Sequence, residues 1–134
     1  FMDLDDFKQV NDERGHEVGD SSLKRFATAL RESFRPDDSF VRYGGDEFVV
    51  VAKGLTRELA EERVATLRAR LHTATPDGPG LRVSVGIAEL APGGRPEDAM
   101  RAADQSMYAA KQNRESLRLR NKVMQLSHMS VAGA

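Results

Sequence analysis

The chain has 134 residues, of which 40% are hydrophobic and 31% charged, with a formal net charge of −1 and no cysteine. This length suits a single domain with a sizeable core. The near-neutral balance gives no basic field to attract nucleic acid, and the lack of cysteine excludes disulfides and thiolate metal sites. The longest apolar run, Phe48 to Ala52, is far too short to cross a bilayer. We therefore expect a cytoplasmic domain that makes no membrane contact itself, either free or as part of a larger, even membrane-bound, protein.

The first third of the chain predicts a strand followed by two helices. Residues 1–5 alternate apolar and acidic side chains, which is the period of a half-buried strand. A short helix is expected over about residues 6–14 and should end at Gly15. A longer helix with one apolar stripe then runs to Pro36.

The pair Gly44–Gly45 joins two apolar strands that we expect over about residues 40–43 and 46–52. A two-residue hairpin turn needs positive φ angles, which glycine adopts without steric cost, so we predict a tight turn of this kind. The same turn places Asp46 and Glu47 where the second strand begins. Two adjacent acids before an apolar strand point to a binding site, although an ordinary solvated hairpin tip is the alternative.

The second half of the chain predicts a helix, a strand and a further helix. Thr56 is expected to cap a helix that continues to about residue 72. A strand is predicted over about 81–87, and a helix over about 97–112. Residues 115–134 show only weak helical periodicity, so we expect a partly ordered tail or linker there.

This order of elements, β-α-α-β-β-α-β-α, predicts an α/β (α+β) fold with a ferredoxin-like, palm-type central sheet flanked by helices. In such a sheet the first strand lies beside the hairpin and brings Asp3 near Asp46 and Glu47. Converging carboxylates repel unless a cation lies between them, and a set of oxygen ligands favours Mg²⁺ or Mn²⁺. Since magnesium often completes its shell with phosphate oxygens, the expected ligand is a nucleoside triphosphate. Acids on a solvated face are the alternative.

A series of short motifs occurs in order along the chain: Asp3-Leu4-Asp5-Asp6-Phe7-Lys8, Asn11-Asp12, Gly15-His16, Gly19-Asp20, Arg42-Tyr43-Gly44-Gly45-Asp46-Glu47-Phe48, Ser84-Val85-Gly86 and Ala103–Lys111. Together they resemble the GGDEF family, the diguanylate cyclases that join two GTP molecules into cyclic di-GMP. The resemblance runs from Phe1 to about Arg114. It therefore implies a GGDEF domain over 1–114 and a separate tail or linker over 115–134.

The resemblance implies a catalytic site with two Mg²⁺ or Mn²⁺ ions. Their ligands would be the carboxylate of Asp3, the carbonyl of Leu4, and the side chains of Asp46 and Glu47. Asp46 would also deprotonate the attacking 3′-hydroxyl. Lys8 would offset the charge that develops on phosphate.

The resemblance also implies where GTP binds. Asn11 and Asp20 would read guanine, because a carboxylate can accept from N1–H and from the exocyclic amine together. The backbone of Asp6 and Phe7 would cradle the triphosphate together with Lys8. The full set of substrate-binding positions is Asp6, Phe7, Lys8, Asn11, His16, Asp20 and Lys111.

The segment from Arg35 to Asp38 fits an RxxD pattern six residues before Gly44. At this offset the family carries a site where the product, cyclic di-GMP, inhibits the enzyme, so the resemblance implies that Arg35 and Asp38 bind product. It also implies an antiparallel homodimer for turnover, and a sensory or receiver domain upstream that controls it.

Two departures from the family pattern bear on activity. An LTGLxNR-like segment upstream of the first strand is missing, and Gln112–Glu115 stand where the family has Gly-Arg-Asn, which leaves Arg114 one residue too close to match the usual arginine. The isolated fragment is therefore expected to be weakly active or inactive. A catalytically silent module that binds GTP or cyclic di-GMP is the alternative. A palm-type polymerase or an adenylate cyclase is disfavoured, because Asn11 with Asp20 favours guanine.

Overall fold

The computed structural model describes the backbone of residues 1–132 and the side chains of residues 1–128. The elements in chain order are β1 (Met2–Leu4), α1 (Phe7–Arg14), α2 (His16–Ser33), β2 (Ser39–Arg42), β3 (Glu47–Val51), α3 (Arg57–His72), β4 (Val83–Val85) and α4 (Pro96–Ala132). Each strand and helix expected from the periodicity is present. The predicted helix boundaries are confirmed at Gly15, which has a φ of 86°, and at Thr56, whose hydroxyl accepts from the Leu59 N–H at 3.3 Å.

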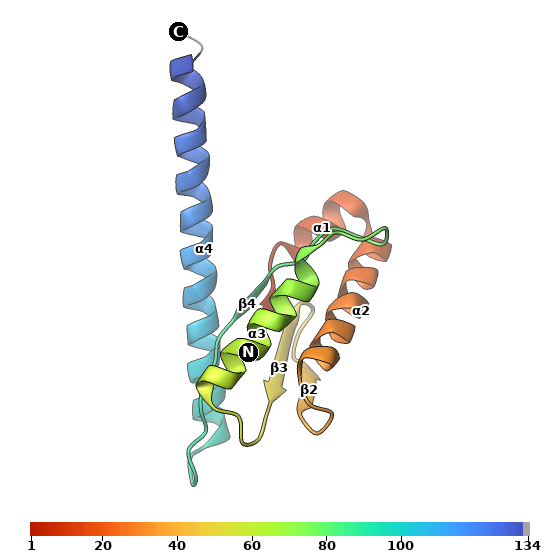
Figure 1. The fold of residues 1–134 in the computed structure, drawn as a ribbon, viewed down its shortest axis with the longest axis vertical. Coiled ribbons are helices and arrows are strands. Elements are labelled where there is room, and N and C mark those ends of the chain that lie inside the picture. Colours follow the sequence, from red (N-terminus) through yellow and green to blue (C-terminus); the bar gives the residue numbers. More distant parts are fainter. Residues whose placement is uncertain (133–134) are drawn as a thin grey trace.

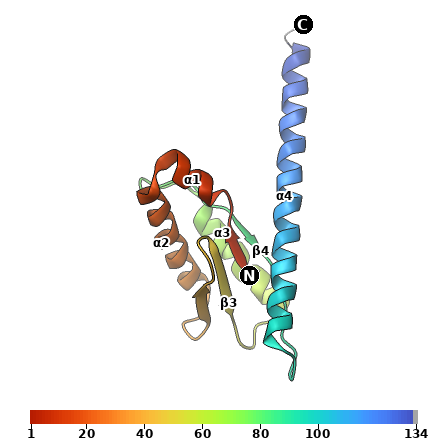
Figure 2. The ribbon, with the colours of Figure 1, turned by 180° about the vertical axis from the view of Figure 1, so that it is seen from behind.

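The four strands form one antiparallel sheet in the order β2-β3-β1-β4. The first strand of the chain therefore lies inside the sheet, between the second strand of the hairpin and β4 (Figure 2). This gives a mixed α/β domain in which β1 and the hairpin are neighbours, as the sequence predicted.

Helices α2 and α3 cover one face of the sheet. Their buried side chains form one core with those of the strands: Met2, Leu4, Phe26, Leu30, Phe48, Leu67 and Leu71. Because side chains alternate along a strand, Asp3 points to the opposite face from Met2 and Leu4. That opposite face is contacted by α4 (Figure 1).

Gly86, which follows β4, allows α4 to lie directly against the sheet. A Cβ added at this position would collide with the backbone of Ala103 and Met107. Both residues are buried. This close contact determines which residues of the following turns of α4 lie beside the end of β1.

Helix α4 does not stop where the sequence predicted. We expected it to end near residue 112 and a partly ordered tail to follow, but the helix continues without a break to Ala132. Residues 113–132 contain neither proline nor glycine, so their propensity sustains a helix even where no apolar stripe packs on the domain. The distal part projects beyond the domain with exposed apolar side chains such as Leu119, Val123 and Leu126 (Figure 1). No helix among the described residues is long and apolar enough to span a membrane.

Candidate active site

The end of β1 brings the acidic residues of the first strand and the hairpin together. Asp3 is the register partner of Glu47 in the ladder between β1 and β3. The Leu4 N–H donates to the carbonyl of Asp46 at 2.9 Å. The predicted neighbourhood of Asp3, Asp46 and Glu47 is thus confirmed at the level of the backbone.

Asp3 is buried, and only part of its carboxylate has a partner. One oxygen, Oδ2, lies 3.3 Å from the Lys111 ammonium, while the other, Oδ1, is buried and has no hydrogen-bond partner among the described residues. Burial, and then the charge of Asp46, raise the pKa of Asp3 above its ordinary value of 3.8, and Lys111 only partly opposes them. The folded chain therefore keeps a proton that the unfolded chain has lost, so the free energy of unfolding falls as pH rises through this range. A bound cation would relieve this cost.

The side chains do not form a finished metal cage. Within the described residues, no three Asp, Glu or His side chains converge closely enough to hold a metal ion. Glu47 folds back over the hairpin turn, so that its Oε2 lies 2.9 Å from where a Cβ on Gly44 would be. A side chain at Gly44 would therefore push the Glu47 carboxylate out of its position.

The turn itself differs from the prediction. Residues 43–46 link the strands, and the N–H groups of Tyr43 and Gly44 both donate to the Glu47 carbonyl, at 2.8 and 3.3 Å. Neither Gly44 nor Gly45 has a positive φ, so the prediction of a primed two-residue turn is wrong. A four-residue connection is most often built around a type I turn, which needs no positive φ.

Arg42 holds this turn and was not predicted to have a role. Its guanidinium donates to the carbonyls of Gly44 at 3.2 Å and Gly45 at 2.7 Å. Two donors from one rigid group fix the path of the backbone immediately before Asp46.

The N-terminus of α1 lies beside this acidic end of the sheet. The N-cap residue, Asp6, has a left-handed conformation with φ 58° and ψ 21°, and its side chain does not cap the helix. The first N–H groups of a helix lack intrahelical partners and carry partial positive charge. Those of Phe7 and Lys8 can therefore donate to an anion, which fits the predicted phosphate cradle.

The residues predicted to read guanine lie where α1 and α2 meet. The side-chain oxygen of Asn11 occupies the position that a Cβ on Gly19 would take, so Asn11 lies directly against α2 next to Asp20. Asp20 is exposed, as is His16 at the start of α2. The structure thus brings Asn11 close to the chain segment that carries Asp20, while the roles of both residues stay predictions.

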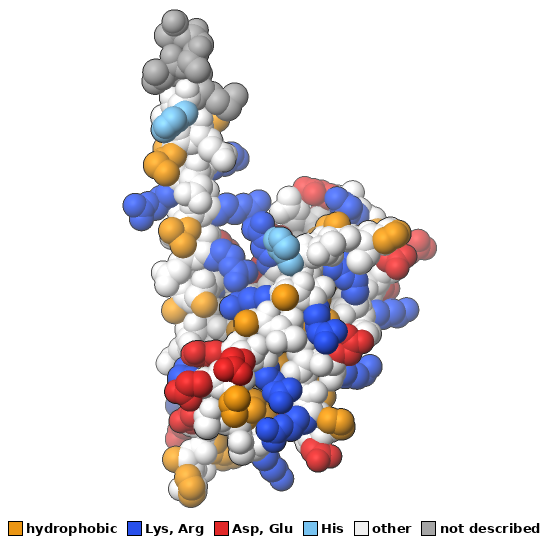
Figure 3. Space-filling model, viewed as in Figure 1, with side chains coloured by type: hydrophobic (Ala, Val, Ile, Leu, Met, Phe, Trp, Pro, Cys, Tyr) orange, Lys and Arg blue, Asp and Glu red, His pale blue; other side chains and the backbone are white. Residues whose placement is uncertain are grey.

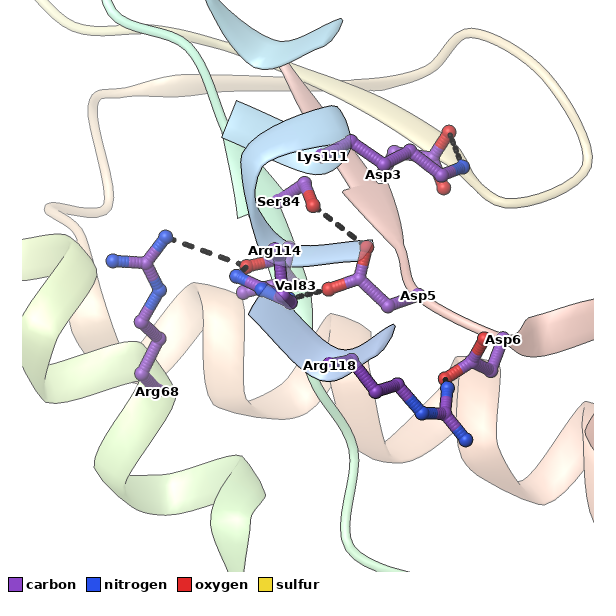
Figure 4. A network of polar contacts seen from close by, with 9 residues as sticks. All are labelled: Asp3, Asp5, Asp6, Arg68, Val83, Ser84, Lys111, Arg114 and Arg118. Atoms are coloured by element: carbon purple, nitrogen blue, oxygen red, sulfur yellow. Dashed lines mark hydrogen bonds and ion pairs between the residues drawn. The ribbon is translucent and has the colours of Figure 1, made fainter. Parts of the chain in front are cut away.

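Three basic side chains extend from one side of α4 toward three successive acidic positions of the segment from β1 to α1 (Figure 4). Spacings of three and four residues place them on one helix face. The pairs are Lys111 with Asp3 at 3.3 Å, Arg114 with Asp5, and Arg118 with Asp6 at 3.1 Å.

Arg114, like Lys111, pairs with a buried carboxylate. It pairs with Asp5, whose side chain is 8% exposed, and it donates to the Val83 carbonyl at 3.0 Å. Asp5 also accepts from the Ser84 hydroxyl at 2.6 Å. Burial lowers the pKa of Arg114 from its ordinary value. Arg114 is therefore held against the strands. This contact could not be predicted from the sequence, because it depends on how α4 crosses the sheet.

The predicted product site lies at the turn between α2 and β2, away from the acidic end of β1. Asp38 is buried, and its carboxylate accepts from the backbone N–H of Arg35 at 2.9 Å. Asp38 therefore stabilises this turn, while the Arg35 side chain is exposed. The product-binding role of both residues stays a prediction.

At the end of β1, a buried aspartate thus lies near an acidic turn, the N-terminus of α1 and a basic face of α4. Residues 1–116 match the family model described as diguanylate cyclase, GGDEF domain. The chain belongs to the GGDEF diguanylate cyclase family.

Curated relatives agree with this assignment. The chain is 37% identical over 115 residues to the diguanylate cyclase DgcS of Shewanella oneidensis, which covers 82% of this chain and 37% of DgcS. It is 33% identical over 115 residues to the probable diguanylate cyclase DgcJ of Escherichia coli, which covers 86% of this chain and 23% of DgcJ. The chain thus corresponds to only a part of these proteins.

Solved structures share the fold. The GGDEF domain of DgcB from Caulobacter crescentus, in complex with c-di-GMP, matches with a TM-score of 0.76 and 28% identity over 84% of this chain and 70% of that one. The active GGEEF domain of a diguanylate cyclase from Vibrio cholerae matches with a TM-score of 0.77 and 29% identity over 84% and 74%. The mixed α/β fold with its four-stranded sheet is therefore that of GGDEF domains.

Proposed function

We propose that this domain condenses two GTP molecules into cyclic di-GMP and releases pyrophosphate. The observation that carries the proposal is the unpartnered, buried Oδ1 of Asp3 beside the backbone of Asp46 and Glu47. The family membership and the DgcB complex with c-di-GMP support it. The strand order supports a ferredoxin-like, palm-type sheet, in which the end of β1 and the hairpin turn form the catalytic edge.

The residues at this edge fit a divalent cation. They offer only oxygen ligands, and the unpartnered oxygen of Asp3 is a buried anionic atom in need of a positive charge. Asp3, the Leu4 carbonyl, Asp46 and Glu47 would hold two Mg²⁺ or Mn²⁺ ions. When bound, such ions lower the pKa of a coordinated hydroxyl and neutralise charge on phosphate oxygens.

The chain's own residues then act on the substrate. Asp46 accepts the proton of a 3′-hydroxyl, and the freed oxygen attacks the α-phosphorus of the other GTP. The bond from that phosphorus to the bridging oxygen breaks, and pyrophosphate leaves; a second, identical step closes the ring. Lys8 and Lys111 offset the charge on the leaving phosphates.

Recognition and assembly complete the proposal. Asn11 and Asp20 read guanine, and His16 lies near the substrate. Each protomer holds one GTP, so two protomers must face each other in an antiparallel dimer. Arg35 and Asp38 form the product-binding site for inhibition. We further propose a domain over 1–114 with a tail or linker over 115–134, in a cytoplasmic protein whose upstream sensory or receiver domain controls dimerisation.

Glu47→Gln tests the chemistry with little risk to the fold. The change removes one anionic ligand and keeps the shape of the side chain, so cyclic di-GMP formation from GTP and Mg²⁺ should fall by at least about a hundredfold. The control is Glu61→Gln on α3, an exposed acid remote from the site, which should leave the rate unchanged. Equal product from wild type and Glu47→Gln, quantified by chromatography, would refute the metal-binding role.

A catalytically silent module that binds GTP or cyclic di-GMP is the second candidate. It is favoured by the ion pair of Lys111 with Asp3, which places an ammonium where a metal ion would lie, and by the lack of a convergent acid cluster among the described residues. Calorimetry with GTP in the presence and absence of Mg²⁺ separates the two. Binding that is indifferent to Mg²⁺ and yields no product supports the silent module.

A further inference from the structure

We propose that Arg118 binds the substrate's terminal phosphate. In the substrate-free protein Arg118 is paired with Asp6, and it exchanges this partner for the phosphate when substrate binds. This inference rests on the proposed function, since it assigns a further residue to the same triphosphate site. Arg118 lies beyond the residues 1–116 that match the family model, so no family assignment reaches it. It is brought to the site only because α4 continues as a helix past the point where the sequence predicted its end.

The three basic residues on this face of α4 differ in how firmly they are held. Arg114 is paired with a buried carboxylate and a strand carbonyl, so it cannot leave without exposing both. Lys111 is bound to the buried Asp3. Among the side chains that the structure describes, Arg118 pairs with Asp6 alone, and the two side chains are 62% and 51% exposed. Solvent screens an exposed pair of this kind, which therefore contributes little to stability, so Arg118 is the cation that can change partner most easily.

The position of Asp6 makes that exchange favourable. Asp6 is the N-cap of α1, but its carboxylate points to Arg118 and leaves the helix N-terminus uncapped (Figure 4). A phosphate on the N–H groups of Phe7 and Lys8 would therefore lie within reach of the same guanidinium. Arginine binds phosphate through two parallel hydrogen bonds and a full charge, which makes phosphate a stronger partner than one solvated carboxylate.

A small hollow between α4 and the turn from β1 to α1 shows where the phosphate would enter. Its lining includes Asp6, Arg82, Lys111 and Arg118, together with Glu115. Basic side chains also gather along the strip between α4 and the rest of the domain (Figure 3). Asp5 and Arg114 complete the lining, so four basic side chains face three acidic ones, and release of Arg118 from Asp6 would make the hollow more attractive to a phosphate.

Binding of inorganic tripolyphosphate tests the proposal without depending on guanine recognition or on turnover. With Mg²⁺ present, calorimetry on the whole chain should show that Arg118→Ala weakens tripolyphosphate and GTP by about tenfold, the worth of one charge-assisted contact, and leaves GMP unchanged. Arg118→Lys should recover part of the loss. Arg120→Ala removes another exposed cation from a different face of the same helix and should have no effect.

The competition of Asp6 with phosphate for Arg118 can be measured separately. Asp6→Asn keeps the backbone, since asparagine also tolerates the left-handed region, and removes the carboxylate that competes for Arg118. It should tighten tripolyphosphate binding several-fold in the wild-type background and markedly less in the Arg118→Ala background.

The outcomes separate this inference from the proposed function. Tripolyphosphate binding that depends on Arg118 supports the inference even if no cyclic di-GMP forms. Wild-type affinity for tripolyphosphate in Arg118→Ala, a loss of equal size in Arg120→Ala, or no tripolyphosphate binding by the wild type would overturn it, even if the enzyme makes cyclic di-GMP.

Discussion

Replacing Arg114 with Met should destabilise the domain far more than the same replacement at Arg118. Both guanidinium groups extend from α4 to a carboxylate, but the pairs differ in burial. The side chains of Arg114 and Asp5 are 34% and 8% exposed, whereas those of Arg118 and Asp6 are 62% and 51% exposed. Met fills most of the space of the arginine stem, so the comparison isolates the charge and its hydrogen bonds.

The magnitude follows from the desolvated carboxylate that is left behind. Removing one partner of a buried ion pair costs about 3–5 kcal/mol, and removing one partner of an exposed pair costs about 0–1 kcal/mol. Because a third of Arg114 touches solvent and Asp5 keeps the Ser84 hydroxyl, we take the lower end, about 3 kcal/mol. For a chain of this size that lowers Tm by about 10 °C, against about 4 °C or less for Arg118→Met.

Thermal and urea unfolding followed by far-UV circular dichroism measure both effects. Asp5→Asn completes a double-mutant cycle with Arg114→Met. Arg114→Met should lower the free energy of unfolding much less once the Asp5 carboxylate is gone. An equal, small loss of stability in Arg114→Met and Arg118→Met, or a full loss of about 3 kcal/mol from Arg114→Met in the Asp5→Asn background, would refute the reasoning.

Two further changes test the packing and the buried charge. Gly86→Ala should lower the free energy of unfolding by about 2 kcal/mol or more, because the added Cβ meets the backbone of α4. The control is Gly45→Ala, whose Cβ would meet nothing within 4 Å and which should change the free energy of unfolding little. A loss of stability at Gly45 as large as that at Gly86 would contradict this explanation. Asp3→Asn should stabilise the metal-free protein at neutral pH, with the gain vanishing as pH falls to 3.8, since burial raises the pKa of Asp3. A pH-independent effect in urea unfolding would show that the charge of Asp3 is not the cause.

Much of the fold could be predicted because strong local patterns determine it. The alternation in residues 1–5 and the apolar runs of the hairpin identify the strands, and the order of elements predicts a sheet in which β1 lies beside the hairpin and Asp3 near Glu47. The glycine at position 15 and the side-chain cap of Thr56 mark helix ends through local interactions. The strand periods and helix ends depend on neighbours in the sequence, which is why they could be predicted.

The features that could not be predicted depend on tertiary placement. The conformation of Gly44–Gly45 is set by the Tyr43 and Glu47 backbone bonds and not by glycine's freedom. The pairing of Arg114 with Asp5 needs α4 to cross the sheet at Gly86. The continuation of α4 was not predicted because its apolar periodicity, as in Leu119, Val123 and Leu126, is weak and these side chains do not pack on the domain. The contact of Arg118 with Asp6 depends on this continuation and could not be predicted either.

The most direct test of the central claim is the fate of GTP at increasing concentrations of the domain. GTP and Mg²⁺ are incubated with the chain from nanomolar to tens of micromolar, and the nucleotides are separated by chromatography. We predict cyclic di-GMP and pyrophosphate, with a rate per protomer that rises as dimers form. GTP that binds, as seen by calorimetry, yet stays unchanged at every concentration would contradict the account and favour a silent module.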